Sequence, residues 1–215
     1  MKEIRPLSSI DATVRIPGSK SITHRAVIAS GLASGQSVLK SFLECEDTLY
    51  TASVLGELGV DVRIKGEDLE VVGTGGRLIS APTKRDLYLG NSGTSFRLLL
   101  SVVALSGGEF LMTGSQRMLE RPIGSLVDAL NRLGVKATCV EQKDCPPVLV
   151  KADGIRGGRV SIPGDQSSQF ISSLLLCGPY AKTDIEITVT GELVSKPYVD
   201  ITIDVMEEFG ARVDR

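Results

Sequence analysis

The chain has 215 residues, 42% of them hydrophobic and 23% charged, which is enough to bury a sizeable core and argues against an intrinsically disordered protein. A formal net charge of −2, only 4% aromatic residues and no tryptophan give no general attraction to nucleic acid or anionic membranes and no base-stacking surface. No apolar run approaches the roughly 20 residues of a membrane span, so we expect neither nucleic acid nor a membrane as a partner.

The first third of the chain predicts alternating strands and helices. The stretch "DATVRI" (11–16) alternates apolar and polar residues and predicts a strand that leads into a helix over "KSITHRAVIASGLA" (20–33). After a second strand, the segment "EDTLYTASVLGELG" (46–59) predicts another helix, with Asp47 as its candidate N-cap. The segment "VDVRIKGEDLEVVGTGG" (60–76) is typical of two strands joined by a turn.

The same order of elements recurs twice. Helices are predicted over "GTSFRLLLSVVAL" (93–105) and "RPIGSLVDALNRLG" (121–134), followed by hairpin-like strands in "VKATCVEQKDCPPVLVKADG" (135–154). A third pair of helices is predicted over "SSQFISSLLLCGPY" (167–180) and "KPYVDITIDVMEEFG" (196–210). The chain therefore contains an internal repeat of about 75 residues.

Three glycines mark this repeat. Gly59, Gly134 and Gly210 each end an amphipathic helix before a short predicted strand, and they are 75 and 76 residues apart. Pro122 and Pro197 stand at the expected first position of a helix, where a missing N–H costs nothing. We expect an α/β fold of three βαβαββ units in a pseudo-threefold arrangement. The third unit stops at "GARVDR", before its closing strands, so we expect a truncated chain.

The first helix of every unit begins with hydroxyl, amide or cationic side chains. A helix N-terminus leaves about four N–H groups without intrahelical partners and carries about half a positive charge, so it favours anions. Three such starts in a threefold repeat can turn toward one region, which predicts a shared anion site. The candidate residues are Ser19, Lys20, Ser21, Thr23 and Arg25, then Asn91, Ser92, Gly93, Thr94 and Ser95, then Ser167, Ser168 and Gln169, with Arg121, Ser195, Lys196 and Tyr198 from the second helices.

These residues also have plainer interpretations. Serine, threonine and asparagine at helix starts are usually N-caps, and the two cations of the first helix could belong to a solvated face. Tyr198 could be a core residue, and His24 is more typical of a packed imidazole than of a general base. The "GSKS" stretch is not a P-loop, which needs glycine directly before the lysine and again five residues earlier, where this chain has Ser19 and Val14.

Five motifs in this order closely resemble the 5-enolpyruvylshikimate-3-phosphate (EPSP) synthase family: "PGSKSITHR", "LGNSGTSFRLL", "RPIGSLVDAL", "SSQF" and "SKPYVDIT". The resemblance covers essentially the whole chain but half of the family's usual length. It implies a fold of two similar domains, with residues 1–215 as the N-terminal domain and the C-terminal domain absent. It also implies transfer of the enolpyruvyl group of phosphoenolpyruvate to the 5-hydroxyl of shikimate 3-phosphate through a tetrahedral intermediate, without a cofactor or metal.

The resemblance also implies roles for individual residues. Lys20 would lie between both substrates as the one catalytic residue of this half, and the phosphoenolpyruvate pocket is where the herbicide glyphosate competes. The residues implied to bind shikimate 3-phosphate are Lys20, Ser21, Arg25, Ser167, Ser168, Gln169, Ser195 and Tyr198. Those implied to bind phosphoenolpyruvate are Lys20, Asn91, Gly93, Thr94, Arg121 and Gln169.

The family's acid and base residues and its further arginines come from the second domain, and no segment here supplies them. Proton transfer needs groups within hydrogen-bond reach, so we expect the chain to be inactive without that domain. Two alternatives remain: a non-catalytic module that binds shikimate 3-phosphate weakly, and the first half of a split enzyme. A UDP-N-acetylglucosamine enolpyruvyl transferase is disfavoured because the "SKS…R" and "SSQ" residues are present, and the charge and motifs do not support an RNA 3′-terminal phosphate cyclase.

The cysteines and the start of the chain indicate a cytoplasmic protein. The four cysteines form no CxxC pair and the chain has one histidine, so we expect reduced structural thiols and no zinc site. The first residues, "MKEIRPLSSIDA", contain no apolar core of a signal peptide and lack the composition of a transit peptide.

Overall fold

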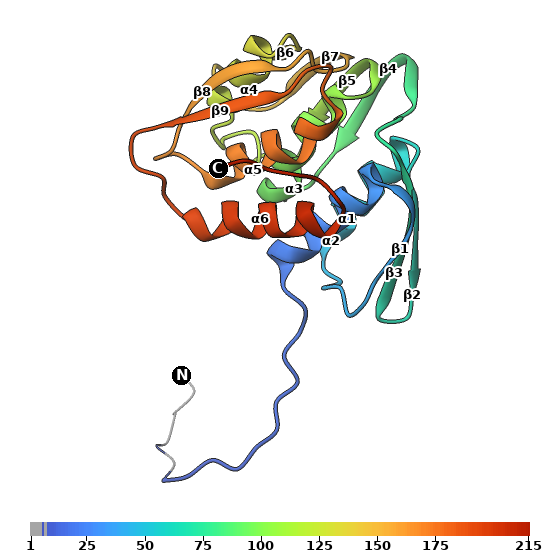
Figure 1. Ribbon diagram of the computed structural model, residues 1–215, viewed down its shortest axis with the longest axis vertical. Coiled ribbons are helices and arrows are strands. Elements are labelled where there is room, and N and C mark those ends of the chain that lie inside the picture. The colour runs from blue at the N-terminus through green and yellow to red at the C-terminus, as the bar shows by residue number, and fades with distance from the viewer. Residues whose placement is uncertain (1–5, 7) are drawn as a thin grey trace.

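A computed structural model describes residue 6 and residues 8–215, which form an α/β fold of three consecutive units (Figure 1). Unit one contains α1 (Lys20–Leu32), β1 (Ser34–Leu39), α2 (Glu46–Glu57), β2 (Asp61–Lys65) and β3 (Asp68–Thr74). Unit two contains β4 (Ser80–Tyr88), α3 (Gly93–Ala104), β5 (Gly107–Thr113), α4 (Gly124–Arg132), β6 (Lys136–Cys139) and β7 (Val148–Asp153). Unit three contains β8 (Gly158–Pro163), α5 (Ser168–Cys177), a 3-10 turn (Gly178–Tyr180), β9 (Ile185–Thr190) and α6 (Lys196–Glu208).

Each unit builds its own sheet, and unit two shows the full pattern. Its strands are ordered β4-β5-β7-β6, with β4 parallel to β5 and with β7 antiparallel to both of its neighbours. The sheet of unit one, β1-β3-β2, has the antiparallel pairings of β5-β7-β6. The sheet of unit three, β8-β9, has the parallel pairing of β4-β5. Strands β1 and β9 both correspond to the central strand β5, but each pairs with one strand only among the described residues.

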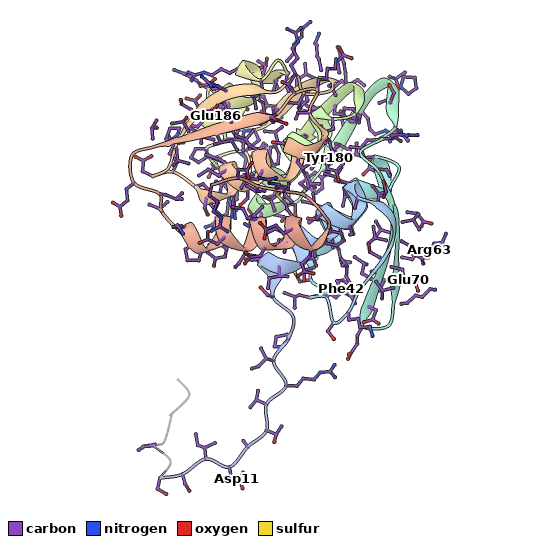
Figure 2. All side chains as sticks on the ribbon, viewed as in Figure 1. Asp11, Phe42, Arg63, Glu70, Tyr180 and Glu186 are labelled. Atoms are coloured by element: carbon purple, nitrogen blue, oxygen red, sulfur yellow. The ribbon has the colours of Figure 1, made fainter. Side chains whose placement is uncertain are left out.

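The sheets cover a layer of helices, with one face turned inward. In Figure 1 the strands of units two and three lie above α3, α5 and α6, and the sheet of unit one lies beside α1. The residues of β7 alternate between buried and more exposed positions, as expected for a strand with one face on the core. On the sheet of unit one, the register partners Arg63 and Glu70 point away from the helices (Figure 2).

The first helices of the units form the interior of this layer. Helix α3 is apolar on almost every side, with Phe96 and Leu98 to Leu100 fully buried, because α5 packs against one side and the strands cover another. The hydroxyls of Ser101 on α3 and Ser173 on α5 lie 2.7 Å apart in the interior, so a hydrogen bond joins the two helices. Their small side chains allow the two backbones to come close together.

The repeat read from the three glycines is confirmed in the backbone. Gly59, Gly134 and Gly210 have φ angles of +94°, +90° and +83°, a left-handed conformation that glycine adopts readily. After each glycine, the next N–H donates to the carbonyl five residues earlier, as in Val60 to Leu55, and all three of these bonds measure 3.0 Å. These are Schellman C-caps, which satisfy carbonyls that a helix end would otherwise leave unpaired.

Several local predictions were wrong. Residues 11–16 form no strand, because no other strand of the described residues lies beside them to complete a ladder; they run away from the body of the protein, with Asp11 far from it (Figure 2). Residues 211–215 also form no strand. The N-cap of α2 is Cys45, and Asp47 lies in the first turn.

The start of α4 also differs from the prediction. The helix begins at Gly124, two residues after Pro122, because the carbonyl of Asp144 accepts hydrogen bonds from the N–H groups of Ile123 and Gly124 and sets the first turn there. Pro197 is the second residue of α6, still within the turn that tolerates proline.

Candidate anion-binding site at the helix starts

The three predicted helix starts are where the sequence placed them. Ser19, Ser92 and Ser167 are the N-caps of α1, α3 and α5, and each side chain accepts a hydrogen bond from a backbone N–H of its own first turn. The plainer interpretation of these serines as N-caps is therefore correct for all three. Capping uses these three hydroxyls, while Lys20, Gly93 and Ser168 are the first residues of the three helices.

Lys20 is held by an acid on the neighbouring helix. Its Nζ lies 2.8 Å from a carboxylate oxygen of Asp47, in the first turn of α2, and its side chain is 49% exposed. The hydrogen bond to Asp47 is the main cause that raises the pKa of Lys20, so the ammonium stays charged and points into solvent. Asp47 itself lies where the positive end of the α2 dipole favours a carboxylate.

The start of α3 is tied to the same place. Ser95 Oγ donates to the carbonyl of Asp47 at 2.8 Å, and Ser95 Oγ also lies 2.6 Å from Ser92 Oγ. The guanidinium of Arg121 lies against the backbone of Gly93, since a Cβ added to this glycine would be 2.4 Å from Nη1 of Arg121. A helix N-terminus and an arginine thus lie next to Lys20 and its partner.

A second arginine joins α3 to α5. Arg97 Nη1 donates to Gln169 Oε1 at 3.0 Å, which leaves the amide nitrogen of Gln169 to donate to Thr94 Oγ1 at 3.1 Å. The Arg97 guanidinium also lies 5.4 Å from the ring centroid of Phe170. Burial, and to a smaller extent the charge of Arg121, lower the pKa of Arg97, so two cations lie close together at this point.

Arg25 lies deeper, between α1, α5 and α6. It is 1% exposed, and its nitrogens donate to Thr202 Oγ1 (2.6 Å), the carbonyl of Ser21 (2.9 Å) and Ser172 Oγ (3.1 Å). Burial lowers its pKa to about 10, and no carboxylate pairs with it in the part of the chain that the structure describes. Its Cζ lies 5.9 Å from the centroid of the Tyr198 ring, which is 44% exposed.

Three of the remaining predicted residues lie at helix starts as well. Ser168 is buried, directly before Gln169, and Ser195 is the exposed N-cap of α6 with a left-handed φ of +56°. Its hydroxyl does not cap the helix. Asn91 is exposed, two residues before Gly93.

Sequence reasoning gave no role to some residues that contribute here. Arg97 lies one helical turn after Gly93 and so on the same face of α3, a spacing that would have signalled it. Asp47 is not the predicted N-cap of α2 but the partner of Lys20. Ser172 and Thr202, which hold Arg25, are buried small hydroxyls whose positions in the sequence carry no signal.

The predicted site residues lie outside two hollows of the protein. Hollows of about 510 Å³ and about 750 Å³ lie elsewhere, the first near Leu32 and Phe209 and the second between α5, α6 and β9, and none of the predicted site residues lines either one. Among residues 6 and 8–215, no three His, Cys, Asp or Glu side chains gather where they could hold a metal. None of the helices in the described part of the chain is long and apolar enough to cross a membrane. The predicted site residues are cations, hydroxyls and helix N–H groups, the chemistry that binds phosphates and carboxylates, with the carboxylate of Asp47 beside Lys20.

Comparisons with known proteins give this chemistry a family. Residues 4–215 match the family described as EPSP synthase (3-phosphoshikimate 1-carboxyvinyltransferase). A 3-phosphoshikimate 1-carboxyvinyltransferase of Shewanella loihica is 45% identical over 217 residues, covering 99% of this chain and 51% of the relative. One of a Sulfurovum species is 42% identical over 212 residues, covering 98% and 49%. The solved structure "EPSP synthase from Acinetobacter baumannii" has a TM-score of 0.81 at 27% identity, covering 94% of this chain and 45% of that one.

The chain thus spans about half the length of the curated relatives that it matches. The motifs that suggested the resemblance, the threefold repeat and the shared helix starts all agree with these matches, so the chain belongs to the EPSP synthase family.

Proposed function

We propose that residues 1–215 are the shikimate 3-phosphate-binding N-terminal domain of an enzyme that moves the enolpyruvyl group of phosphoenolpyruvate to the 5-hydroxyl of shikimate 3-phosphate. The observation that carries the proposal is the convergence of the helix starts. Asp47 contacts both Lys20 and Ser95 of α3, Arg121 lies against Gly93, and Gln169 donates to Thr94. Both substrates carry several negative charges, and this face offers cations with few carboxylates. The family supports the same assignment.

The resemblance to the family divides this face into two subsites. The shikimate 3-phosphate subsite lies along α5, α6 and α1, where hydroxyls and Arg25 would bind the phosphate and Tyr198 would line the ring. Its residues are Lys20, Ser21, Arg25, Ser167, Ser168, Gln169, Ser195 and Tyr198. The phosphoenolpyruvate subsite lies at the start of α3, with Lys20, Asn91, Gly93, Thr94, Arg121 and Gln169.

Arg25 would contribute through charge. The three groups that accept hydrogen bonds from Arg25 are uncharged, so no carboxylate of the described residues balances its positive charge. A phosphate that approaches from the Tyr198 side would therefore meet this charge. Charge interactions are strengthened by low local dielectric, so a buried arginine acts over several ångströms even without direct contact.

Lys20 would lie between the two subsites and stabilise negative charge that develops as the phosphate group leaves. The raised pKa of Lys20 keeps it cationic at neutral pH, so it is suited to electrostatic stabilisation rather than to accepting a proton. Removal of the 5-hydroxyl proton and protonation of the methylene carbon would fall to groups outside this chain. We therefore expect no turnover by this chain alone, and we propose a cytoplasmic location for the protein.

Binding is tested by calorimetric titration of shikimate 3-phosphate into the purified chain. The variant Ser168→Ala is expected to bind about tenfold more weakly, since a hydrogen bond to a charged group contributes about 1.5 kcal/mol, and Ser161→Ala, on the exposed outer side of β8, serves as the matched control. Equal affinities for the wild type and both variants would refute the subsite.

Turnover is tested by phosphate release with both substrates present. Turnover only after addition of the remaining half of the Shewanella loihica relative would support a split enzyme. Binding without turnover in either mixture would favour the alternative of a non-catalytic binding module, and turnover by the chain alone would refute the expected inactivity.

A further inference from the structure

A chain of buried hydrogen bonds runs beneath the site and joins three helices. His24 Nδ1 on α1 lies 2.8 Å from Thr51 Oγ1 on α2, and Thr51 Oγ1 lies 2.9 Å from Ser95 Oγ on α3. Ser95 Oγ lies 2.6 Å from Ser92 Oγ, and all four side chains have 0% exposure. Buried polar groups of this kind need partners, and here they have one another.

The number of protons on these side chains determines which group donates in each of these hydrogen bonds. Ser95 Oγ donates its only proton to the carbonyl of Asp47, so it accepts from both Ser92 and Thr51. Thr51 has then used its only proton on Ser95 and must accept from His24. The imidazole therefore carries its proton on Nδ1, and Nε2, which is buried and has no hydrogen-bond partner in the described structure, carries the lone pair.

The end of this row of hydrogen bonds that is farthest from His24 lies at the candidate anion-binding site. Ser92 is the N-cap of α3 and immediately precedes Gly93, whose backbone lies against Arg121. The carbonyl that ends the chain belongs to Asp47, whose carboxylate holds Lys20. The imidazole proton is thus connected to the two parts of the site that would hold phosphoenolpyruvate.

We propose that His24 is a positioning residue, whose Nδ1–H orients Thr51 and Ser95 so that the start of α3 is fixed against the Lys20–Asp47 pair. The imidazole contacts no substrate and transfers no proton. Its contribution is to keep the hydroxyl of Thr51 pointing at Ser95, because without a donor on the histidine side this hydroxyl can rotate. The consequence for phosphoenolpyruvate rests on the proposed function, whereas the fixed geometry of the helix starts does not.

Two pairs of variants test the donor itself. The amide nitrogen of asparagine lies close to the position of histidine Nδ1, and that of glutamine lies close to Nε2, so His24→Asn keeps the donor and His24→Gln misplaces it. Thr51→Ser keeps the hydroxyl on α2, and Thr51→Val removes it at nearly equal volume. The Thr51 pair keeps the test available if a His24 variant does not fold.

The first measurements need no ligand. Nitrogen-15 NMR of the imidazole at pH 7.5 is expected to show Nδ1 protonated and Nε2 unprotonated. The backbone amide signals of Gly93 and Thr94 are expected to move in His24→Gln and Thr51→Val, and to stay near their wild-type positions in His24→Asn and Thr51→Ser. An Nε2–H tautomer, or equal movement in the conservative and disruptive variants, overturns the inference.

The second measurement separates positioning from general destabilisation. Phosphoenolpyruvate, titrated with shikimate 3-phosphate present, is expected to bind about tenfold more weakly to His24→Gln and Thr51→Val, the effect of a lost charge-assisted hydrogen bond, while affinity for shikimate 3-phosphate changes by about twofold or less. Equal loss of both affinities overturns the inference. If the wild type binds neither substrate, the proposed function fails, and the NMR comparison still decides the role of His24.

Discussion

The buried imidazole of His24 should make the stability of this protein depend on pH. The pKa of His24 is lowered from its ordinary value of 6.5 to about 4, mainly by burial; the charge of Asp47 opposes this shift, and those of Lys20 and Arg25 add to it. Among the described residues, none accepts a hydrogen bond from a proton on Nε2. Since one pKa unit corresponds to about 1.4 kcal/mol, the full effect is about 3 kcal/mol.

The sign follows from which state binds the proton. Above pH 6.5 the histidine is neutral in both the folded and the unfolded chain, and it has no effect on stability. Between pH 6.5 and about 4 the unfolded chain binds the proton and the folded protein does not, so the free energy of unfolding falls as the pH falls. Below pH 4 the folded protein is protonated as well, and the loss reaches its limit.

The assay is urea unfolding at several values between pH 7.5 and pH 4.5, with His24→Asn as the control. Carboxylates titrate in the same range, but they are common to both proteins. The wild type is expected to lose about 2.5 kcal/mol more than His24→Asn over this range. If the free energy of unfolding changes equally with pH in the two proteins, His24 binds its proton as readily in the folded protein as in the unfolded chain. That result would refute the reasoning.

Three further predictions concern the site. Lys20→Met should weaken substrate binding while changing the free energy of unfolding by less than about 1 kcal/mol, because its exposed ion pair contributes little to stability. Gly93→Ala should weaken phosphoenolpyruvate binding about tenfold in calorimetry, because the added methyl group displaces the Arg121 guanidinium, which costs about one charge-assisted hydrogen bond. Thr202→Val should lower the free energy of unfolding by about 1 to 3 kcal/mol in urea, because it removes a partner of the buried Arg25.

Each of these has a control and a contrary result. Lys136→Met, at an exposed position of β6, controls for the loss of a lysine. Unchanged substrate affinity in Lys20→Met would show that Lys20 is not part of the site. A Gly93→Ala protein that binds phosphoenolpyruvate normally would show that the guanidinium moves without cost. Thr188→Val, at an exposed position of β9, is the control for Thr202→Val. Equal free energies of unfolding for the wild type and Thr202→Val would show that Arg25 finds another acceptor.

The fold was predictable where the sequence carries local signals. The three C′ glycines, the apolar run of α3 and the serines at the helix starts each specify a structure within a few residues, and these predictions were confirmed. The alternation over 11–16 misled because a strand needs a neighbour, and the pattern alone does not show whether one is present. The start of α4 at Gly124 depends on the carbonyl of Asp144, 20 residues away in the chain, which no local pattern reveals.

The site was predictable as a set of residue types and not as a set of contacts. Lys20, Gly93 and Gln169 stood out because they occupy helix starts, which are recognisable in the sequence. The contacts of Arg97 with Gln169 and of Arg25 with Ser172 and Thr202 join residues that are 72, 147 and 177 positions apart in the chain. These pairings depend on how α3, α5, α6 and α1 pack together, and that packing emerges only in three dimensions.

Among the described residues, strand β9 of unit three pairs with one strand, whereas the corresponding strand β5 of unit two pairs with two. This difference has a consequence for handling the protein. Strand β9 corresponds to β5, which lies between two strands, yet on one side of β9 the backbone N–H and C=O groups face no strand of the described residues. Natural outer strands are commonly guarded by lysine, proline or a bulge, as β4 is by Pro82 and Lys84, whereas "IEITVT" of β9 has none of these. Concentrated solutions of the chain should therefore self-associate through β9, and a Thr188→Lys substitution should reduce the aggregate seen by light scattering.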